Sequence, residues 1–383
     1  MRTTLLPLND PDLVQTDLDA VLEILRSQRL SMGEAVVAFE EEFARYLGRR
    51  HAVAASSGTI ALLLTLRALG IETGDEVVTS AYSFREVTHA ITLAGARPVF
   101  ADIDYWAGTL DPEKARKVVT EKTRAIVAAN TNGHPAPWGP LRTLATDKNI
   151  ALIEDSSEAI GSIYKGKLVG SFGDCSIFDF SQPGPLVCGE GAMIVTDNDD
   201  TALMLRRLRH RKTEERSSVV LGAFAPLQAG LSDIAAALGL AQLRRLELLL
   251  ARRKRVERWF HEYVRSFEGI KDPYIAPDVD QVNWFLYVVH LGTRFSRSSR
   301  DAIVDDLRQE KIEASAYAHP LHLQSHYHDL GYRRGQLFVT EKVADRAVAL
   351  PFHAHLTEDQ VAFIVGTMKD ASINIGAGTA IYL

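Results

Sequence analysis

The sequence contains little cysteine and no long apolar run. Its 383 residues include two cysteines, Cys175 and Cys188, which are too few for a disulfide framework or a cysteine-based metal site. No stretch approaches about 18 uninterrupted apolar residues, and the opening MRTTLLPLNDPDL has no apolar signal core. We therefore expect a protein of the reducing cytoplasm that neither spans a membrane nor is secreted.

The sequence also has no excess of positively charged residues. Lysine and arginine supply 43 residues against 49 aspartates and glutamates, which gives a net charge of −6. A general nucleic-acid binder carries the opposite balance, so we expect a small-molecule substrate and no nucleic-acid partner. The composition, 46% hydrophobic and 24% charged, is typical of a globular chain that forms one large domain and a smaller one.

Short apolar runs alternate with helical patterns between residues 57 and 245. Ser57-Gly58-Thr59 begins the first of these helices, and Gly70 ends it. Such alternation predicts an α/β fold with a mainly parallel, doubly wound sheet, which binds ligands at the carboxyl ends of its strands. The expected strands are 77–80, 98–102, 125–129, 151–155, 176–180 and 192–196, and the expected helices are 86–94, 112–120 and 141–148.

The rest of the chain predicts a smaller α+β domain. Residues 233–265 have the pattern of one long amphipathic helix, apolar at first and basic later, that links the two parts. A strand at 284–291 and helices at 299–310 and 357–369 are expected to follow. We therefore divide the chain into a large domain, 1–245, and a linker helix with a small C-terminal domain, 246–383.

Eight motifs occur in a fixed order along the chain, each weak alone. They are GEAVVAFEEEFARYLG (33–48), ASSGTIAL (55–62), GDEV (74–77) with the following YSF (82–84), GARPVFAD (95–102), IED (153–155), GKLVGSFG (166–173), GEG (189–191) and AALGLAQL (236–243). Through them the chain resembles the DegT/StrS-type sugar aminotransferases, a branch of the fold type I enzymes that use pyridoxal phosphate (PLP). The resemblance implies an aspartate-aminotransferase-like fold, a homodimer, and a substrate the size of a sugar nucleotide.

A lysine is missing where this family would place one. Residues 178–197 read FDFSQPGPLVCGEGAMIVTD, which is similar to the family's F-S-F-H-P-T-K-N-L-T-T-G-E-G-G segment. Matching the two G-E-G sequences puts Gly184 at the lysine that binds PLP, and Schiff-base chemistry requires an amine there. Lys165 and Lys167 fall in a predicted hairpin turn, and Lys212 lies in a basic stretch typical of a solvated helix face. We do not expect any of the three to replace it.

Four positions resemble PLP contacts of the family. Gly58 and Thr59 begin a helix whose amides and positive dipole end suit an anion, although an ordinary helix cap explains them too. Phe84 can stack on a flat ring or belong to the core. Asp155 ends a buried strand, where the family's aspartate pairs with the ring nitrogen; a salt bridge or a helix cap is the alternative.

Other positions depart from the family. Glu158 replaces a glutamine and puts a carboxylate near the ring's phenolic oxygen. Asp179 replaces a serine that bonds the phosphate; a carboxylate about 5 Å from a phosphate charge costs about 3 kcal/mol at an effective dielectric of ~20. Gln228 begins Q-A-G, which replaces the N-Y-R triplet through which a neighbouring subunit reaches the phosphate. His134 ends N-T-N-G-H, which replaces H-L-Y-G-Q near the substrate.

Four histidines lie within AHPLHLQSHYHDL, residues 318–330, and suggest a metal site. The family has an H-Y-x-P-L-H segment here that folds over the active site. The resemblance therefore favours a substrate-side loop, and we expect no metal.

Three functions remain open. The first is a repurposed enzyme that acts without cofactor, or with non-covalent pyridoxamine phosphate (PMP), and uses Asp155, Glu158, Asp179 and His134 as acid–base groups. The second is a non-catalytic role, as a ligand sensor or as the heterodimer partner of a lysine-bearing homologue. The third is a PLP-dependent aminotransferase with a displaced lysine. The resemblance implies a sugar nucleotide, an aminocyclitol or a related natural-product intermediate as substrate.

Overall fold

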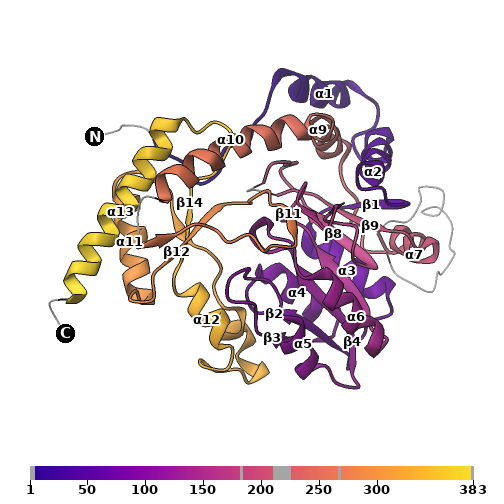
Figure 1. Ribbon diagram of the computed structural model, residues 1–383. Coiled ribbons are helices and arrows are strands. Elements are labelled where there is room, and N and C mark those ends of the chain that lie inside the picture. The colour runs from indigo at the N-terminus through magenta and orange to yellow at the C-terminus, as the bar shows by residue number, and fades with distance from the viewer. Residues whose placement is uncertain (1–4, 182–183, 210–225, 266–268, 381–383) are drawn as a thin grey trace.

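The computed structural model describes residues 5–181, 184–209, 226–265 and 269–380, and a seven-stranded sheet forms the centre of its larger part (Figure 1). The strand order is β1-β9-β8-β5-β4-β2-β3. The bounds are β1 His51–Ala55, β2 Glu76–Ser80, β3 Arg97–Ala101, β4 Thr123–Ala129, β5 Ala151–Asp155, β8 Cys175–Asp179 and β9 Ala192–Thr196. From β8 to β3 all neighbours are parallel, while β9 runs antiparallel to β1 and β8. The predicted mainly parallel sheet is confirmed, although the sequence did not predict β1.

Alternate residues of the central strands face two layers of helices. In β4, Ala125 and Val127 belong to one hydrophobic cluster, and Ile126 and Ala128 belong to another. Successive side chains of a strand point to opposite faces, so a sheet covered on both sides needs apolar residues at every position. The first face is covered by α3 (Gly58–Ala68), α4 (Arg85–Leu93) and α7 (Asp199–Arg209), and the second by α5 (Pro112–Val118) and α6 (Trp138–Lys148).

A third hydrophobic cluster covers the sheet at β1, β8 and β9. Helices α2 (Glu34–Leu47) and α9 (Asp233–Arg244) supply it together with these strands. Phe43 packs edge-on against Phe178, with ring centroids 5.0 Å apart, and against Phe180 at 5.5 Å. This packing fixes the end of β8, and with it the direction in which the chain leaves the sheet after Asp179.

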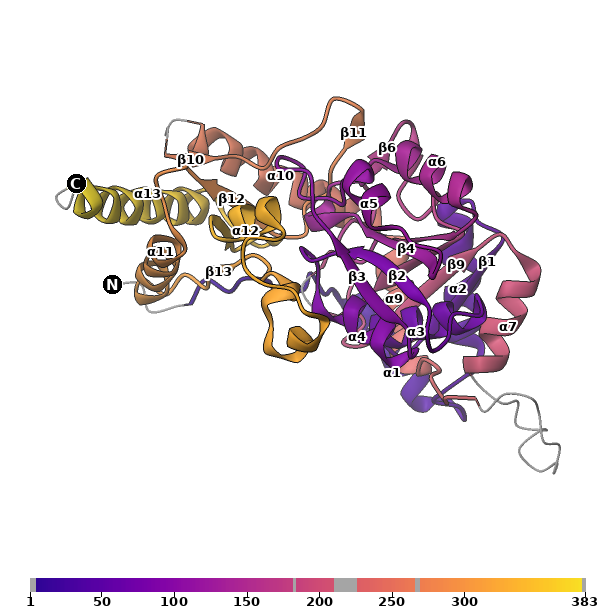
Figure 2. The ribbon, with the colours of Figure 1, turned by 90° about the horizontal axis from the view of Figure 1, so that it is seen from below.

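The C-terminal part contains a four-stranded sheet in the order β10-β12-β14-β13. Its elements are α10 Leu246–Val264, β10 Ile270–Lys271, β12 Tyr287–Leu291, α11 Arg297–Gln309, β13 Ser315–Ala316, α12 Phe338–Ala344, β14 Ala347–Leu350 and α13 Glu358–Ala380. Helices α11 and α13 lie at the opposite end of the molecule from β1 and α7 in both ribbon views (Figures 1 and 2). The predicted α+β character of this part is confirmed.

The two parts share backbone pairing. Strand β11 (Val279–Gln281) pairs with β6 (Ile163–Tyr164), which forms a hairpin with β7 (Lys167–Leu168). Near the N-terminus, Leu6 pairs with Ile312 of the C-terminal part. The pairing of β11 with β6 and the pairing of Leu6 with Ile312 both join residues on opposite sides of residue 245. The domain boundary at that residue therefore stays a prediction.

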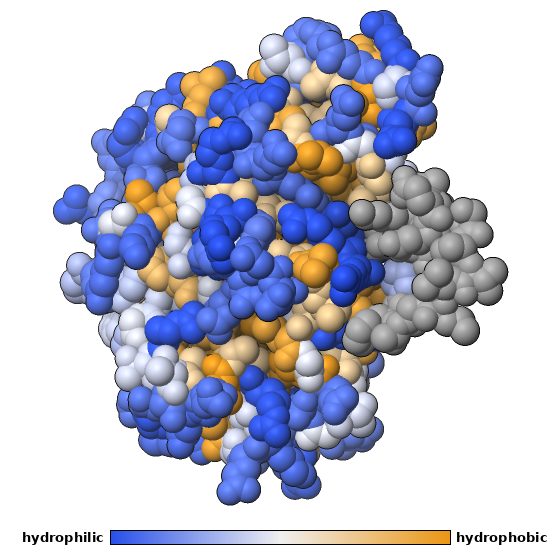
Figure 3. All heavy atoms as spheres, turned by 90° about the vertical axis from the view of Figure 1, so that its right-hand side faces the viewer, coloured by the Kyte–Doolittle hydropathy of each residue, from blue (hydrophilic) through white to orange (hydrophobic). Residues whose placement is uncertain are grey.

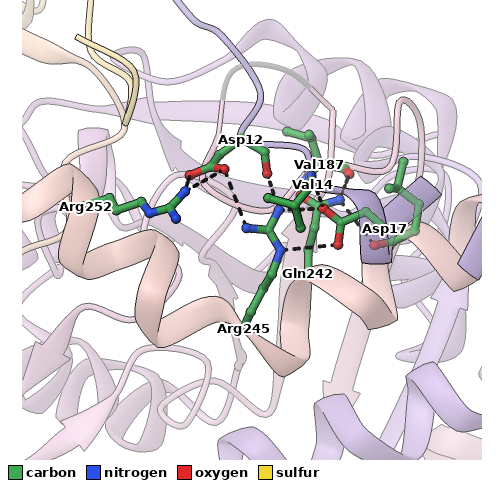
Figure 4. Close-up of polar contacts among 8 residues, drawn as sticks. Asp12, Val14, Asp17, Val187, Gln242, Arg245 and Arg252 are labelled. Carbon is green, nitrogen blue, oxygen red and sulfur yellow. Dashed lines mark hydrogen bonds and ion pairs between the residues drawn. The ribbon is translucent and has the colours of Figure 1, made fainter. Parts of the chain in front are cut away.

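The single long helix predicted over 233–265 is wrong, because α9 and α10 are separate helices that meet at Arg245. This residue has φ −118° and ψ 17°, outside the helical region. Its guanidinium donates to Asp17 of α1 (Gln15–Arg26), with 2.5 Å between Nη2 and Oδ2, and to the carbonyl oxygen of Asp12 (Figure 4). These partners lie more than 200 residues away in sequence, so the local pattern could not reveal the break.

The face formed at the β1 and α7 end is mostly hydrophilic, with smaller hydrophobic areas between the polar residues (Figure 3). Among the described helices, none is both long enough and apolar enough to span a bilayer.

Candidate active site

A cleft of about 370 Å³ opens where the carboxyl ends of β5 and β8 meet the N-termini of α3 and α4. Neighbouring parallel strands end at the same edge of a sheet, so Asp155 and Asp179 come together there. The cleft also receives Gly58, Thr59 and Phe84. Of the positions predicted from the sequence, Glu158 lines it as well.

Carboxylates dominate this lining. Glu86, Asp155, Glu158, Asp179 and Glu190 all contribute, and no lysine, arginine or histidine occurs among the described lining residues. Sequence reasoning missed Glu86 and Glu190 as cleft residues, although Glu190 lies in the G-E-G motif. An anionic ligand would therefore meet a negative potential here.

Asp155 is half-buried at the end of β5. Its Oδ1 accepts a hydrogen bond from the amide of Ser157 at 3.0 Å. Burial raises the pKa of this carboxyl, and the charges of Asp179 and Glu86 raise it further, while the hydrogen bonds from Ser157 lower it. Asp155 is thus easier to protonate than an exposed aspartate.

Glu158 is the carboxyl with the most altered pKa in the cleft. It is 8% exposed. Its Oε2 accepts from the amide of Asn132 at 2.5 Å and from the hydroxyl of Tyr317 at 2.7 Å. Burial raises its pKa to about 8, and the charge of Asp155 adds to the effect against these two hydrogen bonds. At neutral pH this side chain is a proton donor, which differs from the anion that the sequence indicated.

The carboxylate of Asp179 lies at the N-terminus of α3. Its Oδ2 accepts from the amide of Gly58 at 2.6 Å, and its Oδ1 accepts from the amide of Ser181 at 2.7 Å and from the Ser181 hydroxyl. A Cβ built on Gly58 would lie 2.5 Å from Oδ2, so this contact requires glycine at position 58. Asp179 faces the cleft and is held there by the backbone.

Two aromatic side chains form a wall of the cleft. Phe84 is 47% exposed and meets Phe285 edge to face, with centroids 6.0 Å apart. Phe285 comes from the C-terminal part, 201 positions along the chain, and nothing in its sequence context marked it. A flat ring can lie against Phe84, as the sequence suggested.

Gly184 is adjacent to the cleft, and its surroundings have room for a side chain. A Cβ there would lie 3.8 Å from Phe285 and 3.6 Å from the carbonyl oxygen of Leu186, which are ordinary contacts. Lys165 and Lys167 occupy the expected exposed hairpin between β6 and β7. Lys212 lies outside the described residues.

Gln228 is exposed and does not line the cleft of its own chain. It has a left-handed conformation, with φ 51°. The following residue, Ala229, donates its amide to Arg209 and accepts from the amide of Ser56. Within one chain, Gln228 is therefore not brought to the other predicted cofactor positions.

His134 lies apart from the cleft, which corrects its grouping with the acid–base residues. It lines a separate cavity of about 30 Å³. Its Nε2 accepts from the amide of Ala276 at 3.1 Å, and its Nδ1 lies 2.8 Å from the carbonyl oxygen of Pro135. Both ring nitrogens are engaged, and burial lowers the pKa of this imidazole. Asp102 has a structural role, since its carboxylate accepts hydrogen bonds from the amides of Val339 and Thr340.

Another cavity, of about 380 Å³, is lined mainly by cationic side chains, and each of its arginines also pairs with a carboxylate of the chain. It is lined by Arg85, Arg297, Arg300, Arg334 and His319, with Asp345 as its only described carboxylate. The side chain of Arg300 is 2% exposed and donates from Nη1 to the carbonyl oxygen of Ala344 at 2.7 Å. The two cavities lie on either side of the segment 84–86, because Phe84 and Glu86 line the first and Arg85 lines the second.

Comparison with known proteins gives a consistent result. Residues 11–369 match the DegT/DnrJ/EryC1/StrS aminotransferase family. The chain is 34% identical to GDP-perosamine synthase of Caulobacter vibrioides over 365 residues, which cover 95% of this chain and 97% of that protein. It is 30% identical to the spore coat polysaccharide biosynthesis protein SpsC of Bacillus subtilis over 380 residues, 96% and 97% of the two chains. Among solved structures it is similar to DesV of S. venezuelae in complex with a ketimine intermediate, with a TM-score of 0.89, 29% identity and coverage of 97% and 99%.

Proposed function

Because this chain belongs to the DegT/DnrJ/EryC1/StrS aminotransferase family, we propose that it retains the family's cleft for a sugar-derived or other natural-product intermediate but has lost PLP-dependent transamination. Gly184 stands at the position that we assign to the PLP lysine and offers no amine. The proposed activity is proton transfer by the carboxyl groups of the cleft.

The residues of the cleft do not fit PLP or PMP. Both carry a phosphate, and the N-terminus of α3, where an anion would bind, already holds the Asp179 carboxylate. Glu86, Asp155 and Glu190 line the same cleft together with the protonated Glu158, and no described cation does. No step of the proposed reaction therefore involves either cofactor.

Acid–base chemistry is supported by two carboxyl groups in different environments. Glu158, with a pKa of about 8, carries a proton at neutral pH and can donate it to a substrate oxygen. Asp155 lines the same cleft and, when ionised, can accept a proton from the carbon next to a carbonyl group. Glu158 gives one proton to the carbonyl oxygen and Asp155 takes one from the neighbouring carbon, so the pair can convert a keto sugar to its enol. The reverse transfers restore the keto sugar, and the proton on that carbon is exchanged with solvent when Asp155 has exchanged its own.

The two oppositely charged cavities favour a sugar nucleotide over an aminocyclitol. A sugar bears hydroxyl groups that donate to carboxylates, which suits the first cavity, and a diphosphate suits the guanidinium groups of the second. The segment 84–86 between the two cavities would lie against the bond that joins the sugar to the diphosphate. Exposed Leu18, Leu22 and Leu25 on one face of α1 support self-association, so the homodimer remains part of the proposal.

The observation that carries this proposal is the cleft lined by five carboxylates without a described cation. We expect the purified chain, without added cofactor, to exchange a carbon-bound proton of a nucleotide-linked keto sugar for deuterium in D₂O, followed by ¹H NMR. Asp155→Asn should slow this exchange by at least about 100-fold, because it removes the base. Exchange that requires PLP, or amino transfer from glutamate, would refute the proposal. No exchange together with co-purification of a lysine-bearing homologue would support the partner-subunit function instead.

A further inference from the structure

The first turn of α3 has the features that favour binding of an anion. The first amides of a helix have no partner within the helix, and the helix dipole places partial positive charge there. In α3, the amide of Ile60 donates to the Ser57 side chain, and the amide of Gly58 donates to Asp179. Two amides of this turn are therefore already bonded to side chains of the protein itself.

Several contacts hold Asp179 in this position. Its backbone amide donates to the Ser157 hydroxyl at 3.1 Å, and Ser181 donates to Oδ1 through both its amide and its hydroxyl. The absence of a side chain at Gly58 allows Oδ2 to approach the helix. A carboxylate has about four acceptor positions, and these contacts occupy three of them.

We infer that Asp179 is a resident anion that occupies the position of an external phosphate at α3, and that it makes this end of the cleft selective for hydroxyl or ammonium groups of a ligand. A second anion would have to displace the carboxylate or bind beside it, which Coulomb repulsion opposes. A hydroxyl or ammonium group can instead donate to the remaining acceptor position of Oδ2. The inference rests on the proposed function only in placing the ligand in this cleft.

The test measures binding and not activity. Inorganic phosphate and PMP are titrated separately into the full chain by calorimetry, with sodium chloride at matched ionic strength as the blank. We expect no detectable binding of either probe to the wild-type protein at millimolar concentration. Asp179→Ser should bind both probes at least about tenfold more tightly, because it removes the carboxylate and provides a hydroxyl donor.

Two further variants separate the possible causes. Glu190→Gln removes one negative charge from the same cleft but not from the helix N-terminus, and it should change phosphate affinity less than about twofold. Asp179→Asn keeps the shape of the side chain, so it provides a test if the serine variant does not fold. Wild-type affinity equal to that of Asp179→Ser and Asp179→Asn would overturn the inference, and so would an equal gain in Glu190→Gln. Failure of the deuterium exchange would refute the proposed reaction and leave this binding result unchanged.

Discussion

Replacing Glu158 with glutamine should stabilise this protein at alkaline pH and change little at acidic pH. The side chain is buried and accepts from the Asn132 amide and the Tyr317 hydroxyl. Glutamine has the shape of the protonated acid and carries no charge. E158Q should therefore keep these contacts without the cost of ionising a buried carboxyl.

The size of the effect follows from the pKa. Between about pH 4.5 and 8 the native protein keeps the Glu158 proton, while the unfolded chain has released it. The free energy of unfolding therefore falls as the pH rises through this window, and the contribution is fully present only below about pH 4.5. A pKa raised from 4.5 to about 8 corresponds to a loss of up to about 5 kcal/mol, at about 1.4 kcal/mol per pH unit.

The assay is chemical denaturation of both proteins at several pH values between about 5 and 9. The difference in unfolding free energy, E158Q minus wild type, should grow in favour of the variant by up to about 4 kcal/mol across this range, because part of the change already occurs below about pH 5. Taking the difference cancels other titrating groups. His290 and His353, whose pKa values burial lowers to about 4, act in the opposite direction in both proteins.

A second buried glutamate provides the matched control. Glu154 is fully buried at the centre of the sheet, where Oε1 accepts from Asn130, Ser156 and Gly170, and Oε2 accepts from three further donors. Glutamine at position 154 would point its NH₂ group at hydrogen-bond donors. This substitution should lower the free energy of unfolding by about 3 kcal/mol or more at every pH. Parallel pH profiles of wild type and E158Q would refute the reasoning.

Two other substitutions test the site and the fold. Gly184→Lys should fold with little loss of thermal stability, since a Cβ there meets only ordinary contacts, but it should show no absorbance near about 420 nm with PLP unless Asp179→Ser is added. Strong colour or transamination from the single variant would mean that Asp179 does not obstruct the cofactor. Arg245→Leu should lower the free energy of unfolding by about 3 kcal/mol, because it leaves the buried carboxylate of Asp17 without its cation. The control Arg252→Leu, which removes a more exposed guanidinium from Asp12, should cost less than about 1 kcal/mol, and equal losses in denaturation curves would contradict this assignment.

Most strands of the central sheet could be predicted well because each of them corresponds to a local run of apolar residues in the sequence. Apolar runs on both faces predicted the central strands within a few residues, and Asp155 ends its strand as expected. Strand β1 was missed because His51–Ala55, HAVAA, contains Val53 as its one β-branched residue and is otherwise mostly alanine. The break at Arg245 was missed because the local pattern does not mark it, and its partner Asp17 in α1 lies 228 residues away in the sequence.

The site was less predictable because its contacts are tertiary. Gly58 and Asp179 are 121 residues apart, and no pattern in either segment indicates that one donates to the other. Phe285 and Tyr317 approach the cleft from the C-terminal part for the same reason. His134 was grouped with the cleft by its place in a motif, but its ring turns toward the backbone of Pro135 and Ala276.

The open space around Gly184 allows residues larger than glycine at this position. A Cβ there would meet only ordinary contacts, so the surrounding fold does not require glycine. Asp179 is different, because the carboxylate, the glycine at position 58 and the Ser181 hydroxyl fit one another. On the function proposed above, a lysine introduced at 184 would leave the Asp179 carboxylate at the N-terminus of α3. A change at position 184 alone would therefore not restore a phosphate site at this end of the cleft.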